Sequence, residues 1–261
     1  MATVRVLVLR APGINCDEET AYAWKLAGAN ADRRHVRRLI ENPKLLESYQ
    51  VLTIPGGFSY GDDIASGIIL ANQLERHLGQ AIDRLLDRGG LVLGICNGFQ
   101  VLVRMRRLPG RKVGPAVSLT LNDSGRYEDR WVRVRAEVSD CPFLRPGEVY
   151  RLPVAHAEGK VVVAPGRSAA AELAGSGCIA LRYVDQRCQA ACYPENPNGS
   201  IENAAGLTDD TGRVLGLMPH PERHVFPTQT PDGIGDISPD SGPGDACDGL
   251  RIFRCAVAYL A

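Results

Sequence analysis

The sequence predicts an α/β protein with a mostly parallel central sheet and a small antiparallel extension. Over the first 110 residues, short apolar runs of strand length alternate with segments of helical periodicity. These runs are apolar at every position, which is typical of parallel strands buried between two helix layers. Hydrophobic residues make up 44% of the chain and charged residues 23%, values that exclude a disordered or fibrous protein.

The elements of this first half follow from periodicity and from residues that end helices. Apolar residues recur at helical spacing in the longest segment, and Gly28 and Gly89 end two of the helices. The expected strands cover 4–9, 51–54 and 91–95, and the expected helices cover 17–27, 68–88 and 99–105.

The second half has a different texture. Between about 113 and 163, short alternating runs such as 131–135 predict strands with one exposed face. Further strands are expected over 177–184 and 213–218, and a helix over 250–260. No linker divides the chain, so we expect one domain over 1–261.

Residues 227–249 form the one segment that cannot continue a regular element. They include nine Gly or Pro residues, five Asp residues and no Lys or Arg. Loops of this length are often lids or binding loops. We expect this loop to cover the functional site or to pack against a partner.

Charge and hydropathy exclude several classes of protein. Thirty basic and thirty acidic residues cancel, which disfavours a nucleic-acid binder that relies on a positive field. No apolar run approaches the roughly 18 residues of a membrane helix, and Arg5 and Arg10 interrupt the N-terminal run, which is typical of a strand and not of a signal peptide. Eight cysteines without a secretory signal are expected to be reduced thiols in the cytoplasm.

Residues 94–98 (Gly-Ile-Cys-Asn-Gly) carry the strongest functional signal. They follow a buried strand and open a helix, which is the context of a nucleophile elbow. The two glycines leave room for a strained turn that projects Cys96, and the helix N-terminus favours its thiolate. The alternative is that Cys96 is only a small buried residue in a glycine-rich turn.

His220 is the best candidate for a base. Pro219 and Pro221 flank it and favour an extended backbone, in which residues i and i+2 point the same way. Glu222 could then orient one ring nitrogen of His220 and leave the other facing the nucleophile. The alternative is an exposed loop histidine beside an exposed glutamate.

An oxyanion formed during attack by Cys96 would need backbone donors. The elbow offers the N–H of Asn97. The turn at 55–57 (Pro-Gly-Gly) directly follows a strand, so Gly57 can supply a second N–H. Both turns are expected beyond the carboxyl ends of parallel strands, where ligands bind in open α/β sheets.

Two rival sites are weaker. The side chains of Cys188, Cys192, His220 and His224 offer four zinc ligands, but Pro221 prevents the helical face that the two histidines would need, so we expect no metal. The arginines within 33–38 could bind phosphate, although a solvated helix face is the commoner arrangement for such a run.

The motifs together resemble a known family. Residues 94–100 (Gly-Ile-Cys-Asn-Gly-Phe-Gln) with His-Pro-Glu at 220–222 resemble the class I, triad-type glutamine amidotransferases. More narrowly, the chain resembles the glutaminase subunits of phosphoribosylformylglycinamidine synthase, with blocks that run from residue 4 to about 257. These blocks include 12–17 (Pro-Gly-Ile-Asn-Cys-Asp), 55–62 (Pro-Gly-Gly-Phe-Ser-Tyr-Gly-Asp), 122–126 (Asn-Asp-Ser-Gly-Arg) and 218–223 (Met-Pro-His-Pro-Glu-Arg).

The resemblance implies a three-layer, flavodoxin-like fold and hydrolysis of glutamine to glutamate and ammonia. Cys96 would form a γ-glutamyl thioester, His220 would transfer protons, and Glu222 would orient His220. The resemblance also assigns the oxyanion hole to the Gly57 and Asn97 N–H groups. Gln100 matches a position that contacts the bound glutamine.

The resemblance further implies partners. Ammonia would pass to a separate synthetase subunit that converts formylglycinamide ribonucleotide to formylglycinamidine ribonucleotide in purine biosynthesis. ATP and Mg²⁺ are expected on that synthetase, with no cofactor in this chain. A small third subunit often completes the assembly in this family.

The sequence departs from the family at one block and leaves two other functions open. Residues 153–159 carry Ala157 where the family usually has glycine, and alanine would be strained if the backbone there needs a positive φ. The chain could instead be another cysteine-dependent α/β hydrolase, or a non-catalytic regulatory subunit. Release of glutamate from free glutamine separates these possibilities.

Overall fold

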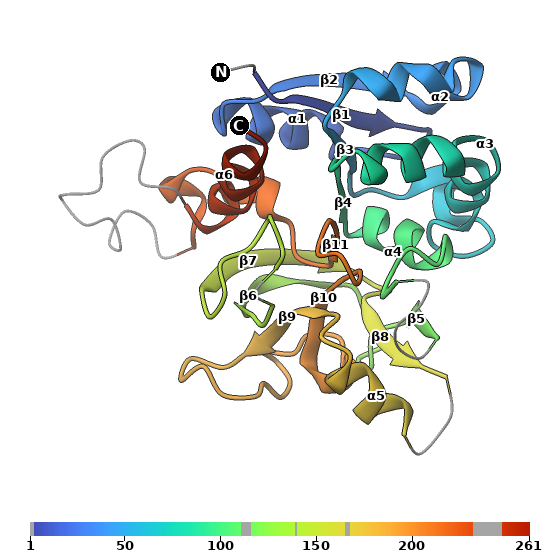
Figure 1. The fold of residues 1–261 in the computed structure, drawn as a ribbon. Helices are drawn as coiled ribbons and strands as arrows, with labels where there is room; N and C mark the ends of the chain where they lie inside the picture. The colour runs from blue at the N-terminus through green and yellow to red at the C-terminus, as the bar shows by residue number, and fades with distance from the viewer. Residues whose placement is uncertain (1–2, 111–115, 139, 165–167, 232–246) are drawn as a thin grey trace.

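A computed structural model describes residues 3–110, 116–138, 140–164, 168–231 and 247–261 (Figure 1). The strands are β1 (Arg5–Arg10), β2 (Asn30–His35), β3 (Val51–Ile54), β4 (Leu91–Ile95), β5 (Val117–Thr120), β6 (Glu128–Ala136), β7 (Val149–His156), β8 (Lys160–Val163), β9 (Ile179–Val184), β10 (Ala204–Thr208) and β11 (Val214–Leu217). The α-helices are α1 (Asp17–Leu26), α2 (Val36–Glu41), α3 (Ile68–Asp87), α4 (Asn97–Arg104), α5 (Ala169–Gly175) and α6 (Asp248–Leu260).

Within these residues, a 9-stranded sheet runs through both halves of the chain in the order β2-β1-β3-β4-β11-β10-β9-β6-β7. The pairs from β2 to β11 are parallel, and the pairs from β11 to β7 are antiparallel. Strands β5 and β8 form a separate antiparallel pair. The predicted fold class is therefore confirmed, with the antiparallel extension continuing the main sheet.

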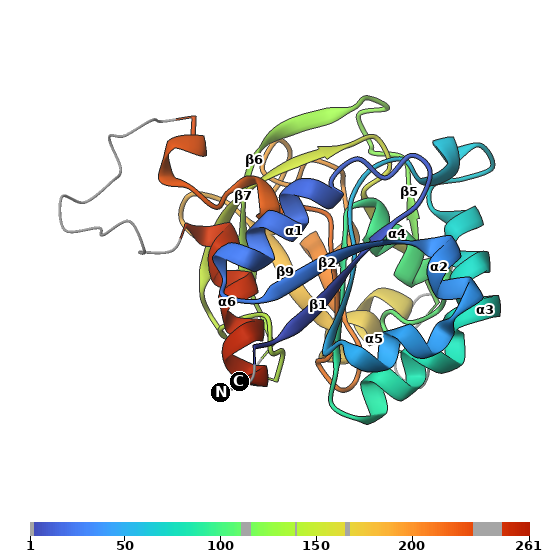
Figure 2. The same ribbon diagram turned by 90° about the horizontal axis from the view of Figure 1, so that it is seen from above.

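Helices cover both faces of the parallel strands. Figure 2 shows α1 and α6 on one side and α2, α3 and α4 on the other. Trp24 of α1 lies fully buried, packs edge-on against Phe253 of α6 with ring centroids 5.0 Å apart, and donates a hydrogen bond to Thr53 Oγ1 of β3 at 2.9 Å. The first and last helices of the described chain thus share one layer.

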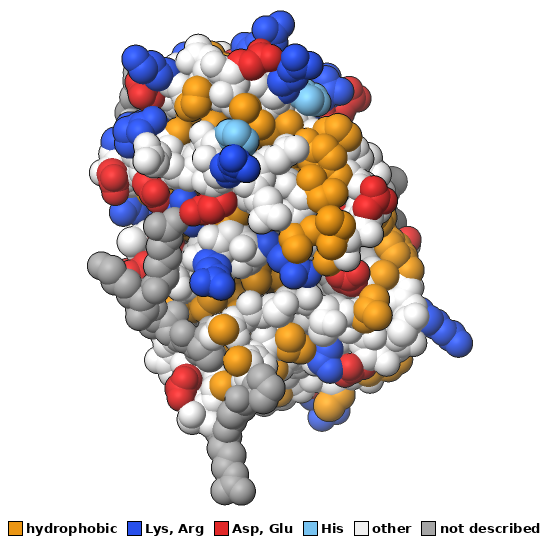
Figure 3. Space-filling model, turned by 90° about the vertical axis from the view of Figure 1, so that its right-hand side faces the viewer, with side chains coloured by type: hydrophobic (Ala, Val, Ile, Leu, Met, Phe, Trp, Pro, Cys, Tyr) orange, Lys and Arg blue, Asp and Glu red, His pale blue; other side chains and the backbone are white. Residues whose placement is uncertain are grey.

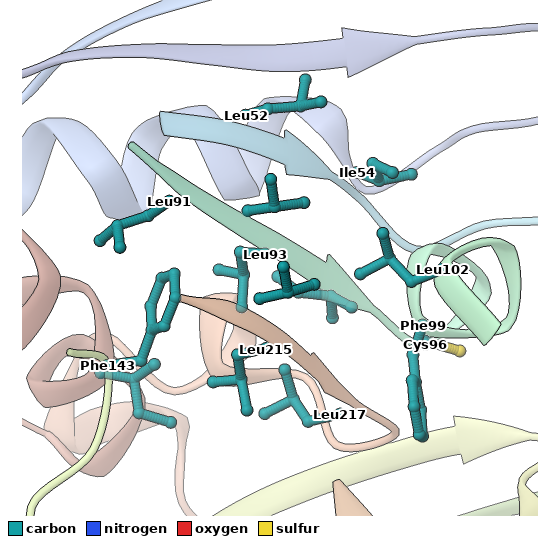
Figure 4. Close-up of a cluster of buried hydrophobic side chains, with 14 of the residues drawn as sticks. Leu52, Ile54, Leu91, Leu93, Cys96, Phe99, Leu102, Phe143, Leu215 and Leu217 are labelled. Carbon is teal, nitrogen blue, oxygen red and sulfur yellow. The ribbon is translucent and has the colours of Figure 1, made fainter. Parts of the chain in front are cut away.

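The central strands are buried on both faces, as their apolar sequences predict. Leu52, Leu91, Leu93, Leu215 and Leu217 are at most 1% exposed and project from β3, β4 and β11 in Figure 4. Burying a leucine side chain contributes about 1.5–3 kcal/mol, so this cluster holds the strand ends firmly in place.

The interpretation of the basic run as one solvated helix face was wrong. Residues 30–35 form β2, an edge strand, so Arg33 and Arg34 lie on the sheet, and only Arg37 and Arg38 lie on the short helix α2. Strand β2 pairs with β1 alone and has little buried surface. It therefore lacks the apolar pattern that predicts a strand.

Two boundaries of the expected long loop also differ. Pro227–Gln229 forms a 3₁₀ turn, and α6 begins at Asp248, inside the segment expected to be loop. The middle of that segment, 232–246, lies outside the described residues, so its expected role as a lid or docking element stays a prediction. Among the described helices, none is both long and apolar enough to cross a membrane.

The tight crossing of α4 over β3 generates a stability prediction. A Cβ on Gly98 would lie 1.9 Å from the carbonyl oxygen of Ile54, so Gly98→Ala must displace backbone. We expect it to lower the free energy of unfolding by about 1–3 kcal/mol or more, measured by urea denaturation. Gly175→Ala is the matched control, because a Cβ there meets nothing within 4 Å. Equal stability of the two variants would contradict the prediction.

Candidate active site

Cys96 sits on a strained turn between β4 and α4. Its backbone has φ 52° and ψ −105°, a conformation that costs a non-glycine residue free energy and that clusters at functional sites. A Cβ on Gly94 would lie 2.6 Å from the Gly98 carbonyl oxygen, so both flanking glycines are required by close backbone packing. In Figure 4 the Cys96 sulfur lies beyond the end of β4, away from the leucine cluster.

His220 and Glu222 form a buried pair. His220 Nδ1 lies 2.6 Å from Glu222 Oε1, and the two residues are 2% and 1% exposed. This excludes the alternative of an exposed loop histidine. The expected extended backbone is wrong at Glu222, because Pro221 starts a 3₁₀ turn (Pro221–Arg223) that brings the carboxylate back toward the ring.

The charge on His220 is set by its neighbours. Burial by itself lowers the pKa of His220, but the Glu222 carboxylate and then the Cys96 thiol oppose this effect. The net result is a pKa well above the usual value for histidine. The site therefore favours an imidazolium that can give a proton to a leaving group.

Three adjacent strand ends bring these groups together. Cys96 follows β4 and donates its backbone N–H to Leu217 O of β11 at 2.8 Å, and His220 follows β11. The turn after β3 lies against both. A Cβ on Gly56 would meet His220 Cε1 at 2.8 Å and Cys96 Cβ at 3.5 Å. Ligands bind at this edge in open α/β sheets.

A pocket of about 200 Å³ opens at this edge. Four of the residues predicted from the sequence line it, namely Cys96, His220, Gly57 and Gln100. The lining also includes Asn15, Cys16, Asp62, Tyr127, Glu158 and Arg223. The sequence offered no derivable role for these six, although Asn15, Cys16, Asp62 and Arg223 lie inside the quoted blocks that carry the family resemblance.

Asn97 and Gln100 shape the pocket through their side chains. Asn97 Oδ1 accepts the Ser59 N–H at 3.2 Å, and Asn97 Nδ2 donates to Gln100 Oε1 at 2.9 Å. Gln100 Nε2 in turn donates to the Glu158 carbonyl oxygen at 2.6 Å. Because Asn97 is the first residue of α4, its own N–H has no acceptor within the helix and suits an oxyanion.

Gly57 meets the backbone requirement of its position. Its φ of +138° is in the region that favours glycine, and a Cβ would lie 2.7 Å from the Gly13 carbonyl oxygen. A β-bridge to Ile14 holds the turn. Gly57 therefore fixes the backbone beside the pocket without a side chain that would block it.

The substitution at Ala157 introduces no strain. Ala157 is not among the described residues with positive φ, and its carbonyl oxygen accepts the Asn122 N–H at 2.8 Å. The conditional expectation of a strained alanine therefore does not apply to this backbone.

The alternative zinc set does not converge. His224 bonds through Nδ1 to the Arg151 carbonyl oxygen, and Cys192 is exposed, whereas His220 is buried. Among the described residues, Cys16, His220 and Glu222 are the group of His, Cys, Asp or Glu side chains whose ligand atoms come within 4.8 Å of one another.

Comparisons with known proteins identify the family of this chain. The family model for the CobB/CobQ-like glutamine amidotransferase domain matches residues 3–260. A protein of Dehalococcoides mccartyi named phosphoribosylformylglycinamidine synthase subunit PurQ is 41% identical, with 99% of this chain and 98% of that protein covered. The subunit of the same name from Thermus thermophilus is 36% identical, with 85% and 90% covered.

A chain in the solved structure of PurLQS from Thermotoga maritima superposes with a TM-score of 0.72 at 30% identity over 100% of both chains. A putative GMP synthase protein from Thermoplasma acidophilum shares the fold at 14% identity, with a TM-score of 0.57 and with 99% of this chain and 94% of that chain covered. The match to the family model and to the curated relatives extends over nearly the whole chain. This chain belongs to the CobB/CobQ-like glutamine amidotransferase family.

Proposed function

We propose that this chain hydrolyses glutamine to glutamate and ammonia as the glutaminase subunit of phosphoribosylformylglycinamidine synthase. The observation that carries the proposal is Cys96 on its strained elbow, beside the buried His220–Glu222 pair, in a pocket at the carboxyl edge of the sheet. Relatives named for this subunit match the chain over nearly its whole length, which supports the choice of substrate and pathway.

The geometry supports a thioester mechanism. The Cys96 thiolate attacks the side-chain amide carbon of glutamine, and the N–H groups of Gly57 and Asn97 hold the oxyanion that forms. His220 gives its proton to the leaving nitrogen, so ammonia departs and a γ-glutamyl thioester remains. His220 then takes a proton from water, which attacks the thioester and releases glutamate and the thiolate.

Glu222 and Gln100 have supporting roles in this mechanism. Glu222 stabilises the His220 imidazolium and fixes which ring nitrogen faces the pocket. Gln100 lines the pocket and holds the Glu158 carbonyl. We therefore assign Gln100 to substrate binding, because its side chain holds the Glu158 backbone that lines the pocket.

Ammonia produced here would serve a partner. The synthetase subunit would use it, with ATP and Mg²⁺ bound on that subunit, to convert formylglycinamide ribonucleotide to formylglycinamidine ribonucleotide, and a small third subunit would complete the complex. The similarity to a chain of the Thermotoga maritima PurLQS structure supports such an assembly. A thiol nucleophile must stay reduced, so the cytoplasm suits the proposed activity.

Exposed hydrophobic surface supports a partner as well. Phe58 and Tyr127 line the pocket and are 49% and 51% exposed, and Ile64, in the segment between Asp62 and α3, is 74% exposed. On the side of the molecule where α2 and α3 lie, hydrophobic side chains also gather in a band that charged residues border (Figure 3). Exposed apolar patches commonly mark interaction surfaces.

The first prediction concerns the nucleophile. Cys96→Ala should lower glutamine hydrolysis by at least about a thousandfold, because the attacking atom is lost. Synthesis driven by ammonium salts in the complex with the synthetase should persist. Glutamate release and product formation from each nitrogen source are the measurements, with Cys192→Ala, an exposed thiol, as the control. If glutamine-dependent activity survives in Cys96→Ala, the chain acts by another route.

The second prediction concerns pH. The Glu222 carboxylate raises the pKa of His220, so Glu222→Gln should lower that pKa. Since His220 must be protonated to release ammonia, the alkaline limb of kcat/KM should move to lower pH by about one unit or more. The maximum rate should fall by at least about a hundredfold. An alkaline limb at the wild-type position would show that His220 does not govern it.

A further inference from the structure

Two carboxylates line the pocket, and the proposed mechanism does not use them. Asp62 and Glu158 are half-buried lining residues, and neither forms an ion pair within the described part of the chain. The basic residue of the lining, Arg223, is engaged elsewhere, because its Nη2 donates to Cys16 Sγ at 3.1 Å and its Nε lies 3.9 Å from Glu19 Oε1. The pocket therefore holds two carboxylates that no described cation neutralises.

A chain of hydrogen bonds places both carboxylates on one side of the pocket. Asp62 Oδ1 accepts from the Gly67 N–H at 3.1 Å and from Asn97 Nδ2 at 3.2 Å. Asn97 Nδ2 also donates to Gln100 Oε1 at 2.9 Å, and Gln100 Nε2 donates to the Glu158 carbonyl oxygen at 2.6 Å. Burial raises the pKa of Asp62, and the nearby charge of Glu158 raises that pKa further. The two like charges therefore act on the same region.

This acidic wall (Asp62 and Glu158) begins beside the nucleophile. Cys96 Sγ lies 3.8 Å from the Ala155 carbonyl oxygen. From that contact, residues 155–158 all line the pocket as far as Glu158. A substrate amide held at the Cys96 sulfur thus has the acidic wall beside the rest of its chain.

The same stretch of chain also contains a buried acceptor without a donor. His156 lines the pocket and is 3% exposed, and its Nε2 has no hydrogen-bond partner among the described residues. Its Nδ1 must carry the proton, because Asn122 Oδ1, 3.1 Å away, is identified as an acceptor by its bond from the Gly159 N–H. Unpaired buried acceptors are uncommon in folded proteins. The free Nε2 therefore points to a ligand with hydrogen-bond donors.

An ammonium group on the substrate fits these features. It carries three N–H donors and a positive charge, so it forms strong, charge-assisted hydrogen bonds with carboxylates. Glutamine carries such a group on its α-carbon, at the end remote from the amide. A cation beside a carboxylate favours the charged form of the acid, which offsets the effect of burial and like charge on Asp62.

We infer that Asp62 and Glu158 bind the α-ammonium group of glutamine and thereby select glutamine among primary amides. This inference rests on the proposed function, and it gives the side chains of Asn97 and Gln100 the task of positioning the acidic wall. An amide without the α-ammonium group leaves the two carboxylates unpaired. Sites built for a polar group discriminate strongly against analogues that lack it.

Glutaramate, which is glutamine without its α-amino group, provides the test. Ammonia release by the full chain in complex with the synthetase is measured with each of the two amides. In the wild type, kcat/KM for glutamine should exceed that for glutaramate by at least about a hundredfold. Asp62→Asn and Glu158→Gln should each lower kcat/KM for glutamine by at least about tenfold, chiefly through KM. Both should leave kcat/KM for glutaramate within about threefold of the wild-type value.

Asp63→Asn is the matched control, because Asp63 is exposed and does not line the pocket, and it should keep the wild-type preference. An equal loss with both amides would indicate a structural role and overturn the inference, as would an unchanged preference for glutamine. If Asp62→Asn does not fold, Glu158→Gln decides, since the Glu158 side chain forms no hydrogen bond in the described chain. A wild type that releases no ammonia from glutamine would contradict the proposed function itself, so the wild-type rate distinguishes the two failures.

Discussion

The close approach of α4 to the end of β3 is the constraint on which the rest of the site depends. The Gly98 Cα packs against the Ile54 carbonyl so tightly that no side chain fits. This contact forces the chain to turn sharply after β4, and Cys96 takes the strain of that turn as a positive φ. The strain persists because β4 lies between β3 and β11, where buried leucines on both faces hold the strand.

The buried charges at the strand ends form a second layer of organisation. Removing one member of a buried ion pair leaves an uncompensated charge, which commonly costs about 3–5 kcal/mol. The His220–Glu222 pair is therefore part of the folded core as well as the proposed source of protons for catalysis. The same arrangement leaves His220 Nε2 buried without a hydrogen-bond partner among the described residues, so this nitrogen is available for the proposed proton transfer.

The antiparallel half of the sheet builds the opposite wall of the pocket. Pro153 of β7 accepts the His220 N–H through its carbonyl oxygen at 2.8 Å. The turn after β7 is held by Asn122, whose Oδ1 accepts from Gly159 N and bonds His156 Nδ1, each at 3.1 Å. Burial lowers the pKa of His156 to about 3, so this ring stays neutral at physiological pH. The antiparallel strands thus supply one side of the pocket, and hydrogen bonds hold its backbone in place.

The local sequence determines several elements of this fold and of its site. The apolar central strands, the helix ends at glycine, the elbow around Cys96 and the pairing of His220 with Glu222 depend on residues that are neighbours in the chain, so their patterns could be interpreted without a fold. The folded chain alone decided what depends on distant neighbours. Strand β2 forms because its backbone pairs with the edge of β1. Glu222 contacts His220 through a 3₁₀ turn and not through an extended segment. Cys16 and Arg223 meet across 207 positions of sequence, and no local pattern encodes that contact, because only the packing of α1 against the strand ends brings the two side chains to the same pocket.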